Sequence, residues 1–191
     1  MKGMTNVFGE LDIKDRWNLK IIKVESHEVK SYTPIGMAYV MMRNASFDSK
    51  DISLSYKYGC VNTRDAFSVS CGENSSACIV DFPGLSLLET RIFIQECLDM
   101  GNLSYMDGGT NTTAINPGRL GDPVINYVHF PAHMYQTLHT HPSHRVGLVI
   151  RGNGKIELDN KEFYDINEGE IFFMRRNCLH NFICEDEDVI V

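Results

Sequence analysis

The chain has 191 residues, of which 43% are hydrophobic and 23% are charged, a composition typical of a globular protein with a sizeable core. Its formal net charge of −7 argues against nucleic acid as a general partner, because phosphate binding needs a cationic surface. No apolar run approaches the roughly eighteen residues of a membrane span, and the N-terminal residues lack the apolar segment of a signal peptide. We therefore expect a cytoplasmic protein with no membrane association, whose six dispersed cysteines are reduced.

The first half of the chain predicts short β-strands. Residues 1–17 carry little pattern, and we expect them to form a loose arm. Breaks rich in Gly, Asn, Asp and Ser then separate short apolar runs, a spacing typical of a sandwich or barrel. The expected strands are residues 19–24, 37–42, 52–58, 66–70 and 77–82.

A helix and a loop are expected in the middle of the chain. Ser86 and Glu89 have the spacing of a capping box, which predicts a short helix to about residue 98, with Gly101 as its stop. Residues 104–123 are rich in Gly, Asn, Thr and Pro and are expected to form a loop region.

The last third predicts a second block of strands. Gly152-Asn153-Gly154 favours the positive φ angles of a tight hairpin turn, and Asp159-Asn160 is a second candidate turn. The whole pattern predicts an all-β fold. The strands expected in this block are residues 147–151, 155–158, 162–166, 170–174, 181–184 and 189–191.

Six of the seven histidines lie between His129 and His180. His139 and His141 are two residues apart, so on a β-strand their side chains point to the same face. If His180 came alongside from a neighbouring strand, three imidazoles would converge. Neutral imidazole is a common ligand for zinc, copper, iron and nickel, and three protein ligands leave positions open for water or substrate.

The spacing around these histidines resembles that of the cupin superfamily, which consists of small β-barrels with two motifs. The first cupin motif is carried here by His139-x-His141-x3-Arg145-x6-Gly152, and the second by Gly169-x5-Arg175-x-Asn177-x2-His180. The resemblance runs from about residue 124 to residue 184 and departs from the usual motifs at four positions. Histidine replaces the leading glycine of the first motif, and Arg and Asn replace the proline and glycine of the second; an arginine replaces the acidic residue of the first. These positions are His133, Arg175, Asn177 and Arg145.

The resemblance implies a cupin-type double-stranded β-helix, or jelly-roll barrel, in residues 101–191. Residues 1–100 have a similar cadence of strands, so we interpret them as a degenerate cupin-like half with a linker helix, which would make the protein bicupin-like. Because a guanidinium cannot ligate a metal, the metal site implied is formed by His139, His141 and His180 without a carboxylate. Fe(II) is the favoured ion, with Mn, Ni or Zn as alternatives.

Two further residues are candidates for catalytic roles. Arg145 on the inner face of the barrel would pair with a carboxylate or phosphate of a small substrate, although a salt bridge to Glu157, Glu168 or Glu170 is the alternative. Tyr127 could donate a proton near a metal. His133 and His144 lie outside the motif spacing and are interpreted as surface or supporting residues.

The favoured function is therefore a three-histidine Fe(II) oxidoreductase or dioxygenase that acts on a small anionic metabolite. Two alternatives stay open: a non-catalytic cupin that binds a small ligand, and a cupin-type sugar isomerase that uses a histidine as base. The isomerase class depends on a His–carboxylate pair, and no acidic residue lies within four positions of His139 or His141. By resemblance, the expected oligomer is a homodimer.

Overall fold

The computed structural model describes residues 3–15, 18–85, 89–95 and 103–191. Within these ranges the regular structure consists of seventeen β-strands and one short 3-10 turn, Met106–Gly108. The prediction of an all-β fold is confirmed. The strands form two compact units, one containing residues 7–98 and 114–125, and the other containing residues 1–6, 99–113 and 126–191. We call them the N-terminal unit and the C-terminal unit.

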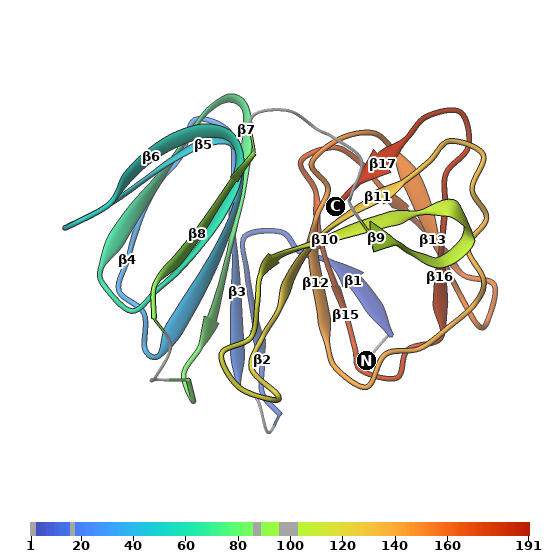
Figure 1. Cartoon of the computed structure of the whole chain (residues 1–191), viewed down its shortest axis with the longest axis horizontal. Helices are drawn as coiled ribbons and strands as arrows, with labels where there is room; N and C mark the ends of the chain where they lie inside the picture. Colours follow the sequence, from blue (N-terminus) through green and yellow to red (C-terminus); the bar gives the residue numbers. More distant parts are fainter. Residues whose placement is uncertain (1–2, 16–17, 86–88, 96–102) are drawn as a thin grey trace. The chain divides into compact units, whose positions relative to one another are not determined.

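The N-terminal unit is built on one antiparallel sheet of seven strands (Figure 1). Its central strand, β7 (Phe67–Phe82), pairs on one side with the long strand β5 (Met37–Ser49). On its other side β7 pairs with two shorter strands, β3 (Leu19–Val24) and β4 (Val29–Tyr32). In spatial order the strands are β2 (Glu10–Ile13), β3 (Leu19–Val24), β7 (Phe67–Phe82), β5 (Met37–Ser49), β6 (Ser53–Thr63) and β8 (Arg91–Gln95), with β4 (Val29–Tyr32) also paired with β7.

Both faces of the central strands of this sheet are buried. One face forms an apolar cluster that includes Val40, Phe47 and Ile79. The other face packs through Tyr39 and Cys60 against Ile115, which follows in the unit's second chain segment. Burial on both faces explains why β5 and β7 have apolar stretches without strict alternation.

Two predictions for the first hundred residues are wrong. The expected loose arm contains two strands, β1 (Met4–Asn6) and β2. The described part of the expected helix, residues 89–95, contains the strand β8 at residues 91–95, while residues 86–88 and 96–98 lie outside the description. The alternating Ile92 and Ile94 favour a strand because β-branched side chains fit a pleated surface, and Ile92 pairs with Val61 of β6.

The C-terminal unit consists of three small antiparallel sheets around one apolar core (Figure 1). The core contains Phe130, Ile156, Phe172 and Phe182, contributed by different sheets. The first sheet is β1–β15 (Ile171–Met174)–β12 (Arg145–Leu148), the second is β14 (Phe163–Ile166)–β13 (Gly154–Leu158)–β16 (His180–Ile183), and the third is β17 (Val189–Ile190)–β11 (Ile125–Phe130)–β10 (Thr110–Ile115)–β9 (Leu103–Ser104).

One of the predictions for the turns and loops of this unit is confirmed, and two are wrong. The turn at Asp159-Asn160 is confirmed, because β13 and β14 pair around it. The hairpin predicted at residues 152–154 is wrong, because β12 pairs with β15 whereas β13 pairs with β14 and β16. Gly152, at φ 78°, turns the chain from one sheet into another. The expected loop 104–123 also contains β10, which pairs with β9 through Thr110 and Ser104.

The N-terminal strand β1 completes the C-terminal unit. It pairs antiparallel with β15, with Met4 opposite Met174, although the two strands are separated by almost the whole chain. Met4 is 1% exposed and lies in the core of this unit. The first residues of the chain therefore cover an edge strand that would otherwise be open.

Met4→Ala is expected to lower the free energy of unfolding by about 2–5 kcal/mol, because it removes a fully buried side chain from the core. Phe8→Ala is the control, since Phe8 is 72% exposed. Urea denaturation monitored by far-ultraviolet circular dichroism measures the free energy of unfolding of both variants. Equal stability of the two variants would contradict the placement of β1.

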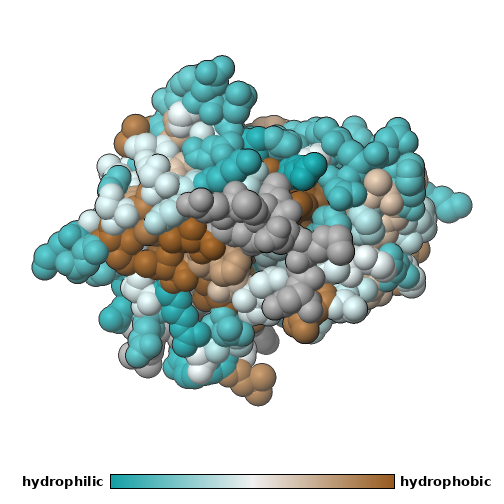
Figure 2. Space-filling view, turned by 45° about the horizontal axis from the view of Figure 1, so that its top comes forward, coloured by the Kyte–Doolittle hydropathy of each residue, from teal (hydrophilic) through white to brown (hydrophobic). Residues whose placement is uncertain are grey.

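Exposed hydrophobic side chains lie along the free edge of the N-terminal sheet. Ile92 and Ile94 of β8 are 44% and 36% exposed, and Tyr56 of β6 is 37% exposed. Figure 2 shows that hydrophobic residues reach the surface on the face it presents. An edge strand of this kind can pair with another chain, and the expected homodimer stays a prediction. In the described part of the chain, no helix has the length and apolar character needed to cross a membrane.

Candidate metal centre

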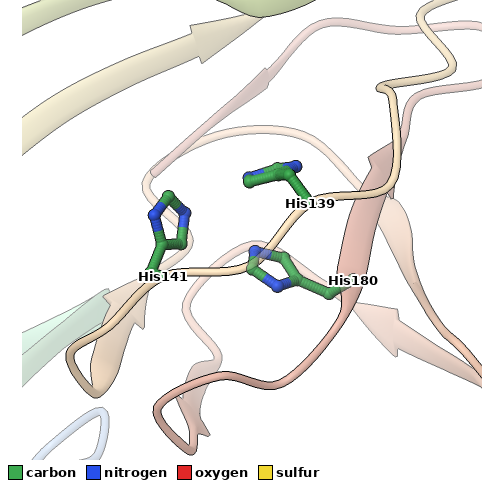
Figure 3. A group of neighbouring side chains, drawn as sticks. All are labelled: His139, His141 and His180. Atoms are coloured by element: carbon green, nitrogen blue, oxygen red, sulfur yellow. The ribbon is translucent and has the colours of Figure 1, made fainter.

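Three histidines come together in the C-terminal unit (Figure 3). His139 and His141 lie on the segment before β12, and His180 is the first residue of β16. Their ring centroids are 4.8 Å apart for His139 and His141, 4.5 Å for His139 and His180, and 5.3 Å for His141 and His180. The structure thus places side by side the three residues that the sequence singled out as metal ligands.

Backbone hydrogen bonds hold the two histidine segments in register. His139 and His180 form an antiparallel bridge in which each N–H donates to the carbonyl of the other, at 3.0 Å both ways. The N–H of Asn177 donates to the carbonyl of His141 at 2.7 Å. Residues directly opposite each other on antiparallel strands project to the same face, so the bridge aims two imidazoles at one point.

Two of the departures from the cupin motifs lie where the backbone has a positive φ angle. His133 and Asn177 stand where the motifs have glycine, and their φ angles are 62° and 57°. This left-handed region favours glycine, and Asn and His are among the other residues found there most often. Asn177 is therefore a conformational substitute for glycine, and its N–H fixes His141.

Hydrogen bonds also orient the rings. Nδ1 of His139 lies 2.8 Å from the carbonyl oxygen of Thr137, and Nδ1 of His180 lies 2.8 Å from the carbonyl oxygen of Cys178. A carbonyl only accepts, so each Nδ1 carries the proton and each Nε2 has a free lone pair. This is the tautomer of a histidine that ligates a metal through Nε2.

Burial keeps two imidazoles of the site, those of His141 and His180, neutral at pH 7. Burial lowers the pKa of His141 from 6.5 to about 4, with smaller contributions from the charges of Arg145, His139 and His180. Burial also lowers the pKa of His180 to about 4, against the effect of its hydrogen bond to Cys178. Neutral imidazole is the form that binds a metal ion, so the burial of this group prepares it for ligation.

The donor set fits a divalent transition metal. One nitrogen from each histidine lies within 4.8 Å of the others. Nitrogens bound to one ion at about 2.1 Å are separated by about 3 to 3.5 Å, so modest ring rotations would close the group. Three nitrogen ligands without a carboxylate suit iron, nickel, copper or zinc better than magnesium or calcium.

A guanidinium lies beside the histidines. Arg145 is the first residue of β12 and is half-buried; its charge contributes to the lowered pKa of His141 and of His180. Burial lowers the pKa of Arg145 itself, but a guanidinium stays charged. Among the described residues no carboxylate pairs with it, and Glu157 instead accepts hydrogen bonds from Tyr135 and Asn181. Arg145 is thus a cation available to an anionic ligand.

Tyr105 belongs to the same part of the barrel, although the sequence did not indicate it. Its ring packs 6.5 Å from Phe130, which stacks on Phe182, and Phe182 lies 6.1 Å from the ring of His180. Burial raises the pKa of the Tyr105 phenol, and the charge of Arg145 opposes that shift. A protonated phenol near a guanidinium adds a hydrogen-bond donor for an anionic ligand.

The structure does not place Tyr127 with the histidines. Val128 and Phe130 of β11 face the core that contains Phe182, so Tyr127 and His129 project from the opposite face of that strand. The buried His129 shares a hydrogen bond with Asp188, whose Oδ2 lies 2.9 Å from Nε2 of His129. Asp188 also accepts the N–H of Ala132 at 2.8 Å, so this His–carboxylate pair braces the β11–β17 edge.

The two other candidates that the sequence set aside are also outside the group. His133 is exposed and donates its backbone N–H to the carbonyl of Glu185. Nδ1 of His144 accepts the N–H of Arg176 at 3.0 Å, and its ring packs 5.3 Å from Phe173. His144 therefore supports the turn before the second histidine segment.

Comparisons with known proteins support this fold. The family model of the AraC-like ligand binding domain matches residues 121–190, which include all three histidines. Among curated proteins, no sequence matches the chain.

Several solved structures have a similar fold over nearly the whole chain. A cupin 2 conserved barrel domain protein from Leptotrichia buccalis is 14% identical, with a TM-score of 0.58 over 98% of this chain and 85% of that protein. Protein Ylba from E. coli is 11% identical, with a TM-score of 0.63 over 99% and 81%. A salicylate 1,2-dioxygenase from Pseudaminobacter salicylatoxidans is 10% identical, with a TM-score of 0.58 over 95% and 74%. At these identities the likeness concerns the fold.

Proposed function

On the premise that this chain is a member of the cupin superfamily by fold, we propose that it is a metal-dependent enzyme. The proposed metal ligands are His139, His141 and His180, the favoured ion is Fe(II), and the proposed reaction is oxidation of a small anionic metabolite. The observation that carries the proposal is the convergence of three imidazoles, two of which, His139 and His180, have Nδ1 engaged with a backbone carbonyl. A ferrous ion in such a site supplies open coordination positions for oxygen and substrate.

Arg145 would bind and orient the substrate. A half-buried guanidinium without a carboxylate partner among the described residues pairs strongly with an incoming carboxylate, because its planar fork matches both oxygens. The described residues provide no carboxylate opposite Arg145, so an anionic substrate would supply the counter-charge. Tyr105 would contribute a further donor on the same side.

A non-catalytic ligand-binding function is the second candidate. The matching family model describes a ligand binding domain, and this favours capture of a small molecule without chemistry. In that case the histidines would act as hydrogen-bonding groups, and binding would be insensitive to a chelator. Metal content separates the two candidates.

A sugar isomerase is disfavoured by the hydrogen bonds of the site. That class depends on a His–carboxylate pair, but the Nδ1 atoms of His139 and His180 bond to backbone carbonyls. A His–carboxylate pair in the described part of the chain, His129 with Asp188, is formed on the opposite face of β11 from the core.

Elemental analysis of the untagged protein, prepared anaerobically with iron, is expected to find about one metal ion per chain. His141→Ala is expected to lose the ion, because two imidazoles bind far more weakly than three. His133→Asn is the matched control and is expected to retain it, since His133 is exposed and Asn tolerates its positive φ angle. Absence of metal from the wild type after loading would contradict the proposal and favour the non-catalytic ligand-binding function.

Arg145→Gln is expected to reduce the affinity for small carboxylates by about 10- to 100-fold, because a charge-assisted hydrogen bond contributes about 1.5–3 kcal/mol. Thermal-shift titration of the metal-loaded protein with a panel of mono- and dicarboxylates measures this effect. Arg151→Gln, which changes an exposed arginine of the same unit, is the control. Equal carboxylate binding by both variants would refute the proposed role of Arg145.

A further inference from the structure

A loop in the C-terminal unit holds an aspartate in an unusual conformation. Asp107 lies inside the short turn Met106–Gly108, with φ 55° and ψ 35°. The N–H of Tyr105 donates to the carbonyl of Gly109 at 2.8 Å, and the N–H of Gly109 donates to the carbonyl of Met106 at 3.1 Å. These bonds close the loop around Asp107. A residue other than glycine stays in the left-handed region when its surroundings stabilise it there.

The carboxylate of Asp107 is bonded to the segment that carries the first histidine. Its Oδ2 accepts the N–H of Thr137 at 2.6 Å, and its Oδ1 accepts the hydroxyl of Thr137 at 3.2 Å. Both oxygens of the carboxylate are therefore used on one residue, thirty positions away along the chain. Both residues are exposed, and the two hydrogen bonds make a two-point clamp at the surface of the unit.

Thr137 is also the residue that orients His139. Its carbonyl oxygen lies 2.8 Å from Nδ1 of His139. The peptide N–H and the hydroxyl of Thr137 are thus held by Asp107, while its carbonyl holds the imidazole. Thr137 therefore links the carboxylate of Asp107 to the imidazole of His139.

We propose that Asp107 is a positioning residue for the metal site, which acts through Thr137 to fix the ring plane and the tautomer of His139. The inference rests on the proposed function, because it concerns metal binding at the same three histidines. The sequence motifs do not indicate this role, because Asp107 lies outside both cupin motifs.

The hydrogen bonds from Thr137 to Asp107 restrain the backbone of Thr137. Fixing Thr137 fixes the direction of its carbonyl, and this direction determines which way Nε2 of His139 points. The N–H and the carbonyl of Thr137 belong to different peptide groups, so Asp107 acts on the acceptor that faces Nδ1 through backbone geometry. A hydrogen-bonded partner behind a ligating histidine both orients it and raises its basicity.

The clamp adds to the backbone support that His139 receives from its bridge to His180. His180 is 2% exposed and is the first residue of a paired strand, and the carbonyl of His141 is held by Asn177. His139 follows two exposed residues, Thr137 and Leu138. Asp107 restrains the exposed residue whose carbonyl faces Nδ1 of His139.

The test measures the affinity for Co(II), which reports the three-imidazole site through its visible spectrum, by competition with a chromophoric chelator. Asp107→Ala is expected to weaken Co(II) binding about tenfold, the lower end of the effect of removing such a supporting partner. Asp107→Asn keeps an acceptor for the Thr137 N–H but loses the charge, so its affinity is expected to lie between those of the wild type and Asp107→Ala.

Asp122→Asn is the matched control, because Asp122 also accepts a backbone N–H within a loop, from Arg119 at 2.7 Å, but belongs to the N-terminal unit. The melting temperature of each apo variant is measured alongside. In the apo wild type, ¹⁵N NMR is expected to find His139 as the Nδ1–H tautomer, and a mixture of tautomers in Asp107→Ala.

Three outcomes decide the inference. Weaker Co(II) binding by both Asp107 variants, with unchanged binding by Asp122→Asn, supports it. Equal affinity of the wild type and Asp107→Ala, whether or not the melting temperature falls, overturns it and leaves the proposed metal site intact. Failure of the wild type to bind Co(II) at all contradicts the proposed function, and the inference falls with it.

Discussion

The antiparallel bridge between His139 and His180 is the constraint on which the candidate site depends. Its two hydrogen bonds set the register between segments that are far apart in the sequence, and register determines which side chains share a face. A slip of one residue would turn one imidazole out of the group. The short sheets of the C-terminal unit, closed by β1 and packed around Phe172 and Phe182, hold that register.

The chemistry of the site follows from the burial and the hydrogen bonds of its polar groups. Burial keeps His141 and His180 neutral, while carbonyls at Thr137 and Cys178 select the tautomer. Arg145 keeps its charge although burial lowers its pKa, and it has no carboxylate partner among the described residues. Imidazole ligands beside such a cation suit an ion with open positions and a substrate that carries negative charge.

The sequence was informative where spacing alone decides geometry. His139 and His141 share a face because side chains alternate along an extended chain, and the motif spacing brought His180 beside them. It was misleading at β8, where the capping box at Ser86 and Glu89 competes with the strand preference of Ile92 and Ile94. Tertiary pairing with β6 decides that competition, and no local pattern encodes it.

Residues that act through distant partners could not be predicted. Asp107 and Tyr105 reach the site only because their loop folds against the barrel, and β1 reaches β15 across almost the full length of the chain. Tyr127 was assigned to the site from its residue type, but its parity on β11 is opposite to that of Val128 and Phe130, which face the core. Strand parity requires the exact strand limits, and those came from the structure.

The most direct test of the metal centre is X-ray absorption spectroscopy of the anaerobic, iron-loaded protein, which identifies the atoms around the ion. The account predicts a first shell of nitrogen and oxygen, with multiple-scattering features of three imidazoles at about 2.1 Å. A shell that contains sulfur, or one with fewer than three imidazoles, would contradict ligation by His139, His141 and His180.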